Sequence, residues 1–287
     1  MEVCADMTQT DMPREGSSQT DRSRTGVLRT TLITGASGGL GLEFAKIFAA
    51  RGSDLILAAR SLDKLEQIAS ELSKNHSIHV DVIRSDLSLE RGAEDLYAAV
   101  KALNRPVDGF VNNAGAGRAL DTVDIDPEEL KHLLHLDVTS YAMLCHLIGA
   151  DMVRQGRGKI LNVSSTTAFF PDPHFNIYGP SKAFVLSLTE AMAGELKGTG
   201  VTVTALCPGP VRTDWAVHAG KAYPAMAADP AKVAMSGFRA MQAGRLYVIP
   251  GIGTAAGTFF LTLLPRRLRV EIGAWWQNAM IRKSRGK

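Results

Sequence analysis

Three side chains of types that can move protons stand close together in the second half of the sequence. Tyr178 and Lys182 are four residues apart at the start of a predicted helix, so their side chains should share one helix face. Ser165 stands thirteen residues before Tyr178, at the end of a predicted strand. A tyrosine titrates at about 10, but a nearby ammonium group stabilises the phenolate and lowers that pKa. With the serine holding an oxygen atom, this pair could pass a proton to or from a carbonyl or alcohol oxygen.

Each of the three residues also has an ordinary structural interpretation. Ser165 could cap a helix or close a turn, Tyr178 could pack half-buried, and Lys182 could be a solvated helix position. Taken singly, each structural interpretation is the commoner one, so the chemistry depends on what else the sequence contains.

A glycine-rich turn near the start of the chain adds to the chemical interpretation. The stretch TLITGASGGLGLEFA, residues 31–45, begins as a strand, ends as a helix and places Gly35, Gly39 and Gly41 where the two meet. A tight turn, a closely approaching pyrophosphate and packing of the helix on the strand each exclude a Cβ atom there. Free amides at the helix start favour phosphates, whereas a Walker-type loop is excluded because Gly-Lys-Ser/Thr is missing. A purely structural turn is the alternative.

The end of the second predicted strand bears on which cofactor would bind. NAD-selective sites usually carry an acidic residue there, which binds the ribose 2′-hydroxyl group. Here LILAAR ends in Arg60, whose charge suits a 2′-phosphate, and Ser37 could donate a hydroxyl beside it. The sequence therefore favours NADP(H) over NAD(H). The alternative is that Arg60 is only the solvated start of the next helix.

Strand and helix patterns alternate along the chain. Strands are predicted at about 27–33, 54–59, 78–83, 107–111, 159–163, 201–206 and 246–249. Amphipathic helices are predicted after the glycine turn and at about 61–74 (capped by Ser61), 89–103, 127–154, 180–197 and 230–243. This alternation predicts an α/β fold with a doubly wound parallel seven-stranded sheet, a Rossmann fold in a single domain over residues 28–250. Ligands of such folds bind beyond the carboxyl ends of the strands.

The overall composition excludes several classes of protein. The 287 residues are 45% hydrophobic and carry a net charge of +3 from scattered side chains, so nucleic acid is not an expected partner. Three widely spaced cysteines predict neither a disulfide framework nor a metal or redox motif. Residues 1–27 are polar and lack the apolar core of a signal peptide, so we expect a disordered N-terminal tail and a cytoplasmic location.

Taken together, the motifs resemble those of the short-chain dehydrogenase/reductase superfamily from about residue 28 to residue 251. They come in order: Thr34-Gly35-x-x-x-Gly39-x-Gly41, Asp86-Leu87, Asn112-Asn113-Ala114-Gly115, then Ser165, Tyr178 and Lys182, and last Pro208-Gly209 with Thr213. No single motif is decisive. Their joint occurrence at the expected spacing is highly specific.

The resemblance implies a role for each matching residue. Tyr178 would be the general acid/base, Lys182 would lower its pKa and bind the nicotinamide ribose, and Ser165 would orient the substrate oxygen. The cofactor-binding set would be Gly35, Ser37, Gly39, Leu40, Gly41, Arg60, Asp86, Leu87, Asn113, Ala114, Gly115, Tyr178, Lys182, Pro208, Gly209 and Thr213, with no metal. Within this set, Asp86 and Leu87 would contact the adenine. By analogy with the family, the protein would be a homo-oligomer assembled through its fourth and fifth helices.

One position departs from the family pattern. Many relatives have an asparagine in the long fourth helix, where it helps to hold a water molecule that connects the lysine to solvent. Here the matching position is Asp137. A carboxylate near Lys182 would favour the ammonium form, yet would also offset the field that lowers the pKa of Tyr178. Asp137 could hold the water or form only a structural ion pair, and we do not count it as catalytic.

These features predict an NADP(H)-dependent oxidoreductase that interconverts a ketone or aldehyde and an alcohol, with Tyr178 as general acid/base. The alternative is a catalytically silent NADP(H)-binding sensor or scaffold, which only Asp137 favours. A related isomerase or dehydratase is less favoured, because no additional acid/base pair can be placed from the sequence.

The segment after the sixth predicted strand should set substrate specificity. Residues 213–228, TDWAVHAGKAYPAMAA, have the small residues of a mobile lid. An apolar pocket between Tyr178 and Trp215 could be lined by Phe169, Phe170, Phe175 and Trp215, although core packing explains aromatic residues equally well. We therefore expect a small hydrophobic carbonyl or alcohol substrate. His174 and His218 should be lid or surface residues, because no partner ligands for a metal are spaced near them.

Residues 251–287 form an apolar and basic C-terminal extension. The stretch 246–264 contains no charged residue and is followed by Arg266, Arg267 and Arg269, which raises the question of a membrane span. Proline and glycine interrupt its first half, so an interfacial element is favoured over a span. Peripheral membrane contact, packing on a partner subunit and packing over the substrate pocket are all open.

Overall fold

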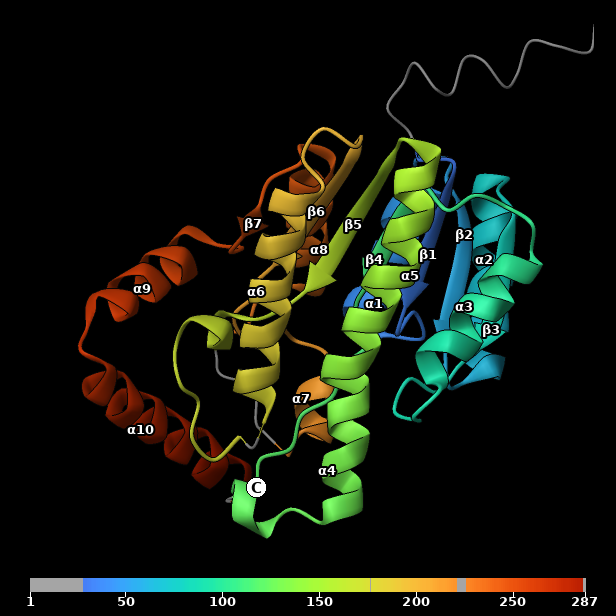
Figure 1. The fold of residues 1–287 in the computed structure, drawn as a ribbon. Coiled ribbons are helices and arrows are strands. Elements are labelled where there is room, and N and C mark those ends of the chain that lie inside the picture. Colours follow the sequence, from blue (N-terminus) through green and yellow to red (C-terminus); the bar gives the residue numbers. More distant parts are fainter. Residues whose placement is uncertain (1–27, 176, 221–225, 286–287) are drawn as a thin grey trace, which may run out of the picture.

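The computed structural model describes residues 28–175, 177–220 and 226–285, so the tail expected over residues 1–27 lies outside the described residues. Seven parallel strands form one sheet in the order β3-β2-β1-β4-β5-β6-β7 (Figure 1). The strands are β1 (Thr30–Thr34), β2 (Asp54–Ala59), β3 (Val80–Arg84), β4 (Gly109–Asn112), β5 (Gly158–Val163), β6 (Val201–Leu206) and β7 (Tyr247–Val248). The strand order reverses between β1 and β4, which is the point where open α/β sheets bind ligands. The predicted doubly wound parallel sheet is confirmed.

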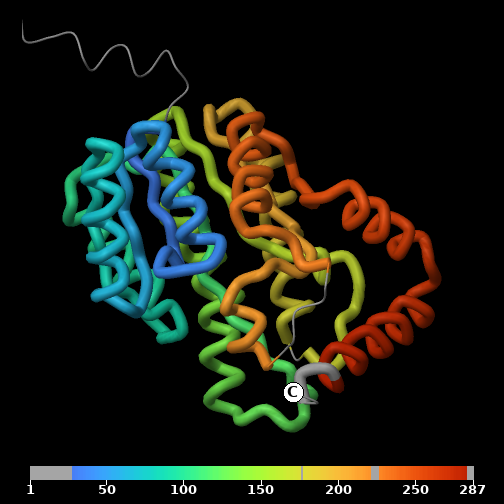
Figure 2. Tube along the Cα trace, turned by 180° about the vertical axis from the view of Figure 1, so that it is seen from behind, coloured from blue at the N-terminus to red at the C-terminus, as the bar shows by residue number. Residues whose placement is uncertain are grey.

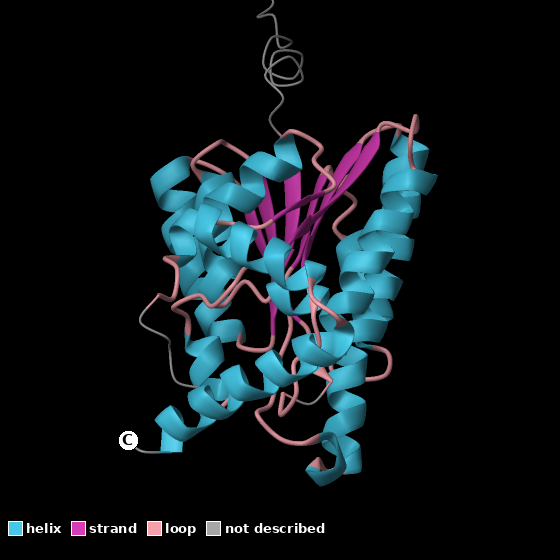
Figure 3. Cartoon of the chain, turned by 90° about the vertical axis from the view of Figure 1, so that its left-hand side faces the viewer, coloured by secondary structure: helices cyan, strands magenta, loops and turns pink. Residues whose placement is uncertain are grey.

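Helices cover both faces of the sheet, as Figure 3 shows. On one face lie α1 (Gly39–Ala49), α2 (Leu62–His76) and α8 (Pro230–Gln242); on the other lie α3 (Gly92–Ala102), α5 (Ser140–Gln155) and α6 (Tyr178–Glu195). Each layer encloses its own hydrophobic cluster, one around Phe44 and Phe48 and the other around Phe110 and Ile148. Strands buried on both faces have continuous apolar sequences, and this is why the sequence pattern identified them.

The helix predicted at 127–154 is a continuous helical run in three parts. After α4 (Pro127–Leu134) comes one stretch of π-helix, η2 (His135–Thr139), and then α5. The Asp126 side chain caps α4 by accepting from the amides of Glu128 and Glu129. The run Pro127–Gln155 is long and apolar enough to cross a membrane, but α5 packs into the core, which accounts for its composition.

Several predicted element ends differ from the structure by one to three residues, and one predicted cap is absent. Ser61 precedes α2 but its side chain makes no capping hydrogen bond, so that prediction is wrong. The strand predicted at 246–249 shortens to two residues, because it pairs only with the end of β6 at the edge of the sheet. Helix α6 begins at Tyr178 instead of residue 180, which places Tyr178 and Lys182 on the first turn and the next.

The C-terminal extension forms two helices that stand outside the body of the fold. These helices, α9 (Ile252–Leu263) and α10 (Arg266–Arg285), leave the sheet after β7 and run along the outside of the molecule (Figures 1 and 2). The buried Gln277 side chain of α10 hydrogen-bonds to Asp172, which lies in the segment before α6. The extension therefore returns to the residues that lead into Tyr178.

Candidate active site

The glycine turn between β1 and α1 leaves room for an anion. Gly35 and Gly39 have φ values of 64° and 54°, a region that favours glycine. A Cβ atom on Gly41 would overlap the carbonyl oxygen of Gly35, so only glycine lets α1 pack this closely on the turn. Among the described residues, no side chain caps α1, and its first turn has no acidic residue. The exposed amides and the helix dipole therefore fit the phosphates of a dinucleotide.

The end of β4 holds this turn in place. The Asn113 side chain donates to the carbonyl oxygen of Thr34 at 2.9 Å, and its backbone amide donates to the Thr34 hydroxyl at 2.9 Å. The amide of Ala114 reaches the same hydroxyl at 3.1 Å. The side chain of Asn113 therefore braces β4 against β1, a structural role that the sequence did not indicate.

The proposed adenine end lies where β2 and β3 finish. Arg60 follows β2 and is exposed, while Ser37 in the glycine turn is half-buried. Burial alone would raise the pKa of Asp86, but hydrogen bonds from Ser88 and the nearby charge of Arg60 outweigh it and lower that pKa. The side chain of Leu87 packs into the hydrophobic core, and so does part of Leu40, so these two could meet a cofactor mainly through their backbones.

Tyr178, Lys182 and Ser165 meet at the carboxyl edge of the sheet. The Lys182 ammonium lies 5.6 Å from the centroid of the Tyr178 ring. It is almost fully buried, and it donates to the carbonyl oxygen of Val163 at 3.3 Å and to the Tyr141 hydroxyl at 3.5 Å. The sequence had no assignment for Tyr141, although its place four residues after Asp137 on a helix was a usable signal.

Asp137 faces Lys182 directly. Its carboxylate forms a buried ion pair with the Lys182 ammonium at 3.0 Å and accepts from the backbone amide of Ala116 at 3.1 Å. Burial raises the pKa of Asp137, while Lys182 and the Ala116 amide oppose that rise. Gly115 is required here, because its Cβ atom would stand 2.7 Å from the Asp137 carboxylate. The π-helical turn η2 presents Asp137 to this site, as π-bulges often do at functional positions.

Lys182 acts on the pKa of Tyr178 in the expected direction, but burial outweighs it in the protein by itself. Burial of its hydroxyl raises the pKa of Tyr178 to about 12, although Lys182 and a hydrogen bond from Ser165 act to lower it. The charge of Asp137 adds to the rise, as the sequence suggested it would. At neutral pH Tyr178 is therefore a protonated phenol, which can donate a proton more readily than accept one.

Ser165 lies near Tyr178, and its hydroxyl also makes two structural hydrogen bonds. Its hydroxyl accepts from the amide of Thr167 at 3.2 Å and so caps the short helix η3 (Thr166–Phe169). It also donates to the carbonyl oxygen of Pro208 at 3.5 Å. The capping interpretation of Ser165 is thus correct, and it is compatible with a site role because the same hydroxyl faces Tyr178.

Aromatic rings close the space in which a substrate was expected. Trp215 lies on the short helix α7 (Asp214–His218), and its indole donates to the carbonyl oxygen of Gly115 at 3.1 Å. Its ring centroid is 4.9 Å from that of Tyr178, and the ring of Phe175 is 4.8 Å from Tyr178 on another side. The rings of Phe175 and Trp215 therefore form the apolar surroundings of the half-buried Tyr178 side chain.

The other aromatic and histidine expectations have mixed outcomes. Phe169 packs beside Tyr247 in a separate small cluster, with ring centroids 5.9 Å apart, and does not reach Tyr178. His174 pairs with Asp121 at 2.6 Å, and no group of three potential metal ligands occurs within the described part of the chain. Residues 221–225 of the expected lid lie outside the described residues.

The loop after β6 reaches back to the glycine turn. The Thr213 methyl group would stand 3.4 Å from a Cβ atom on Gly39. A Cβ atom on Gly209 would likewise come within 3.0 Å of Thr254 on α9. Pro208, Gly209 and Thr213 therefore lie between the glycine turn, Ser165 and the C-terminal extension.

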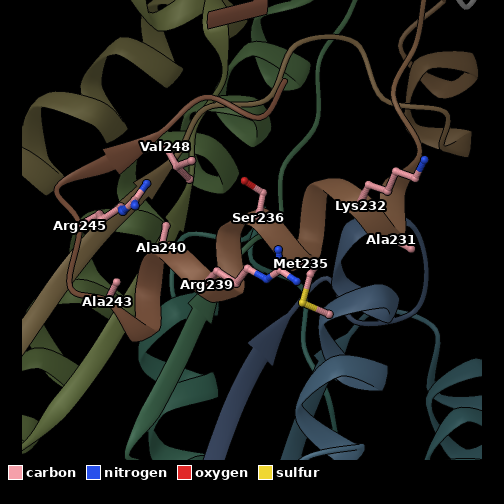
Figure 4. A pocket seen from close by; sticks show the side chains of 9 residues that line it. All are labelled: Ala231, Lys232, Met235, Ser236, Arg239, Ala240, Ala243, Arg245 and Val248. Atoms are coloured by element: carbon pink, nitrogen blue, oxygen red, sulfur yellow. The ribbon is translucent and has the colours of Figure 1, made fainter. Parts of the chain in front are cut away.

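A groove that the sequence did not suggest lies elsewhere, along α8 (Figure 4). Its lining residues are Ala231, Lys232, Met235, Ser236, Arg239, Ala240, Ala243, Arg245 and Val248. None of these is a predicted site residue, and the three basic side chains among them are exposed. The groove therefore contributes nothing to the arrangement around Tyr178.

Comparison with known proteins agrees with this geometry. A model of the short chain dehydrogenase family matches residues 29–223. A very-long-chain 3-oxoacyl-CoA reductase from Vanderwaltozyma polyspora is 33% identical over 183 residues, which are 60% of this chain and 52% of that protein. Human 17-beta-hydroxysteroid dehydrogenase type 3 is 33% identical over 186 residues, which are 63% of this chain and 59% of that protein. The match thus spans little more than half the length of these two relatives.

A solved structure is similar over more of the chain. It is a short-chain dehydrogenase from Sphingobium yanoikuyae in complex with NADPH, with a TM-score of 0.76 and 30% sequence identity. The similarity covers 82% of this chain and 92% of that one.

The buried ion pair yields a stability prediction. Asp137→Leu would leave the Lys182 ammonium buried without its carboxylate, so the free energy of unfolding should fall by about 3–5 kcal/mol in urea titrations. The control is Asp95→Leu, which removes an exposed partner of Arg91 and should change the free energy by no more than about 0.5 kcal/mol. If the two substitutions lowered the free energy of unfolding equally, the buried ion pair would not be needed for stability.

Proposed function

The chain belongs to the short-chain dehydrogenase family, and on that premise we propose that it is an NADP(H)-dependent oxidoreductase that interconverts a ketone or aldehyde and an alcohol. The observation that carries the proposal is the meeting of Ser165, Tyr178 and Lys182 at the carboxyl edge of the sheet. The reductase and dehydrogenase names of its relatives support the same reaction class.

Each of the three residues has a definite task in this reaction. When bound, NADP(H) supplies or accepts the hydride. Tyr178 donates its hydroxyl proton to the carbonyl oxygen of the substrate as that oxygen gains negative charge, and takes a proton back in the reverse direction. Ser165 holds the same oxygen by a hydrogen bond. Lys182 stabilises the phenolate that Tyr178 becomes, and Asp137 limits that stabilisation.

The cofactor would lie along the glycine turn and extend from Arg60 to Tyr178. The uncapped start of α1 would receive the pyrophosphate, and the exposed guanidinium of Arg60, with the Ser37 hydroxyl, would bind the 2′-phosphate. A similar structure that holds NADPH supports a nicotinamide cofactor here. The remaining members of the predicted cofactor set border this path.

The substrate we propose is a hydrophobic small molecule. Phe175 and Trp215 surround Tyr178 with aromatic rings, so a substrate that reaches the Tyr178 hydroxyl would meet apolar side chains. The names of the two relatives refer to very-long-chain acyl and steroid substrates, which are likewise apolar.

We further propose a cytoplasmic homo-oligomer. Subunits would meet through α4, α5 and α6, where Leu134, Val153 and Phe184 leave 36–40% of their apolar side chains exposed. Any membrane association would be peripheral and through residues 251–287.

A catalytically silent NADP(H) sensor or scaffold is the second candidate, and one observation favours it. The Asp137 carboxylate pairs with the Lys182 ammonium and offsets part of the effect by which that ammonium lowers the pKa of Tyr178. Binding of NADPH without turnover of any ketone, aldehyde or alcohol across a broad panel would select this alternative.

The first prediction concerns the proton donor. Tyr178→Phe removes the only hydroxyl that we propose to donate a proton, so NADPH oxidation with a ketone substrate should fall by about 100-fold or more. Tyr247→Phe changes a half-exposed tyrosine outside the site and should leave the rate unchanged. A Tyr178→Phe variant as active as the wild type would eliminate Tyr178 as the donor.

The second prediction concerns the 2′-phosphate. Arg60→Asp replaces a cation by a carboxylate that can accept from a 2′-hydroxyl, so kcat/KM for NADPH should fall by about tenfold or more relative to NADH. Lys74→Asp changes the charge of the exposed end of α2 by the same amount and should not alter that ratio. An unchanged ratio for Arg60→Asp would remove the basis for NADP(H) preference.

The third prediction concerns pH. Carbonyl reduction needs Tyr178 protonated, and its pKa of about 12 keeps it so across the neutral range. Alcohol oxidation needs the phenolate and should therefore rise with pH up to that pKa. Asp137→Asn removes the negative charge that raises the pKa of Tyr178, so the oxidation profile should move to lower pH while reduction at neutral pH keeps its shape. A shift to higher pH would contradict the role of Asp137.

A further inference from the structure

The two C-terminal helices, α9 and α10, present their polar and small residues to the body of the protein. The residues of α9 and α10 that the structure buries are Thr258, Gly273 and Gln277. Gln277 hydrogen-bonds to Asp172, and a Cβ atom on Gly273 would meet the carbonyl oxygen of Pro171. The fully buried residues of this arm are therefore small or polar, whereas apolar Leu261, Leu264 and Ile272 are half-buried.

The exposed surface of the same arm carries many large apolar side chains. Its exposed large side chains are Ile252 at 91%, Phe259 at 60%, Phe260 at 65%, Leu263 at 65%, Leu268 at 40%, Val270 at 41%, Trp275 at 69% and Trp276 at 39%. Along α9, Ile252, Phe259 and Leu263 recur at helical spacing on the side away from Thr258. A surface helix in water usually buries its apolar side chains and exposes its polar ones. The exposed apolar side chains here therefore indicate a less polar environment.

The charge of the arm differs from that of the rest of the chain. Residues 251–287 contain seven Lys or Arg and one Glu, a net charge of +6, which leaves −3 for the other 250 residues. No charged residue interrupts α9, and exposed Arg266 and Arg267 begin α10 directly after it. Apolar and aromatic side chains flanked by arginines are the composition of helices that lie in a membrane interface.

We propose that the exposed surface of α9 and α10 docks on the surface of an anionic lipid bilayer. Helix α9 has 12 residues, a length of about 18 Å at 1.5 Å per residue, which is too short to span a hydrocarbon core of about 30 Å. The arm therefore lies in the interface, with Phe259, Phe260 and Trp275 among the acyl chains and the arginines at the headgroups. A second copy of this chain is a poorer occupant, because it would bring another +6 charge to the same surface.

Docking would bring the segments on both sides of the site, around His174 and Gly209, close to the membrane. Asn278 of α10 lies 3.4 Å from His174, in the segment that leads into Tyr178, and Thr254 of α9 lies against Gly209. This consequence rests on the proposed function, since a hydrophobic substrate could then pass from the bilayer to Tyr178. The docking itself does not require turnover.

Vesicle sedimentation tests the proposal with the full chain. Wild-type protein should pellet with vesicles of phosphatidylcholine and phosphatidylserine, and less with phosphatidylcholine alone. The double variant Phe259→Ser with Phe260→Ser should reduce binding by about tenfold or more, because two buried aromatic rings are lost. The control, Val123→Ser with Leu246→Ser, changes two exposed apolar residues outside the arm and should bind as the wild type.

Several outcomes would overturn the proposal. Equal binding by the wild type and the Phe259/Phe260 variant would show that the arm is not the contact. No binding, together with a dimer in analytical ultracentrifugation that the double variant dissociates, would identify a second copy as the occupant. Brominated lipids should also quench the fluorescence of Trp275 and Trp276 more than that of Trp215, and a double variant with Trp275→Phe and Trp276→Phe should lose that quenching.

The docking and the proposed chemistry fail separately. Tyr178→Phe should bind vesicles as the wild type does, because binding needs no proton transfer. The Phe259/Phe260 variant should reduce a water-soluble ketone at the wild-type rate without vesicles. A wild-type protein that turns over the ketone but does not bind vesicles would therefore refute the docking alone. A wild-type protein that binds vesicles but does not turn over any carbonyl or alcohol would refute the chemistry alone.

Discussion

Burial of the Lys182 ammonium is the constraint on which the arrangement of the site depends. A charge removed from water must find acceptors in the protein. Here they come from three elements: the Asp137 carboxylate on η2, the carbonyl oxygen of Val163 at the end of β5, and the Tyr141 hydroxyl on α5. These contacts hold the first turns of α6 against the carboxyl edge of the sheet. Tyr178, one turn before Lys182, is placed by the same contacts.

The same ion pair also sets the protonation state of Tyr178. Lys182 by itself would make the phenol more acidic, but the carboxylate beside it and the burial of the hydroxyl act in the opposite direction. The aromatic cover of Phe175 and Trp215 contributes to that burial. In the protein alone, Tyr178 is accordingly protonated, and a protonated phenol can donate to a substrate oxygen that develops alkoxide character.

The body and the C-terminal arm follow opposite rules of polarity. In the body, apolar strands are covered on both faces and apolar side chains fill the core. In the arm, Gln277 is covered whereas Phe259 and Trp275 are open. The hydrophobic effect accounts for both patterns if the surface of the body faces water and the exposed surface of the arm faces a less polar medium. The contact through Asp172 and Gln277 joins these two environments beside the segment that leads to Tyr178.

The amino-acid sequence by itself determined the α/β class, the family, the strands 54–59 and 201–206 residue for residue, and the meeting of Ser165, Tyr178 and Lys182. Continuous apolar runs and motif spacing carry that information because they are local or repeat along the chain. It failed for the cap at Ser61, and it did not anticipate the ring contact between Trp215 and Tyr178 or the burial that raises the pKa of Tyr178. Only the tertiary structure decided these, because hydrogen-bond geometry, desolvation and Coulomb energy depend on distances between groups that the order of residues does not specify.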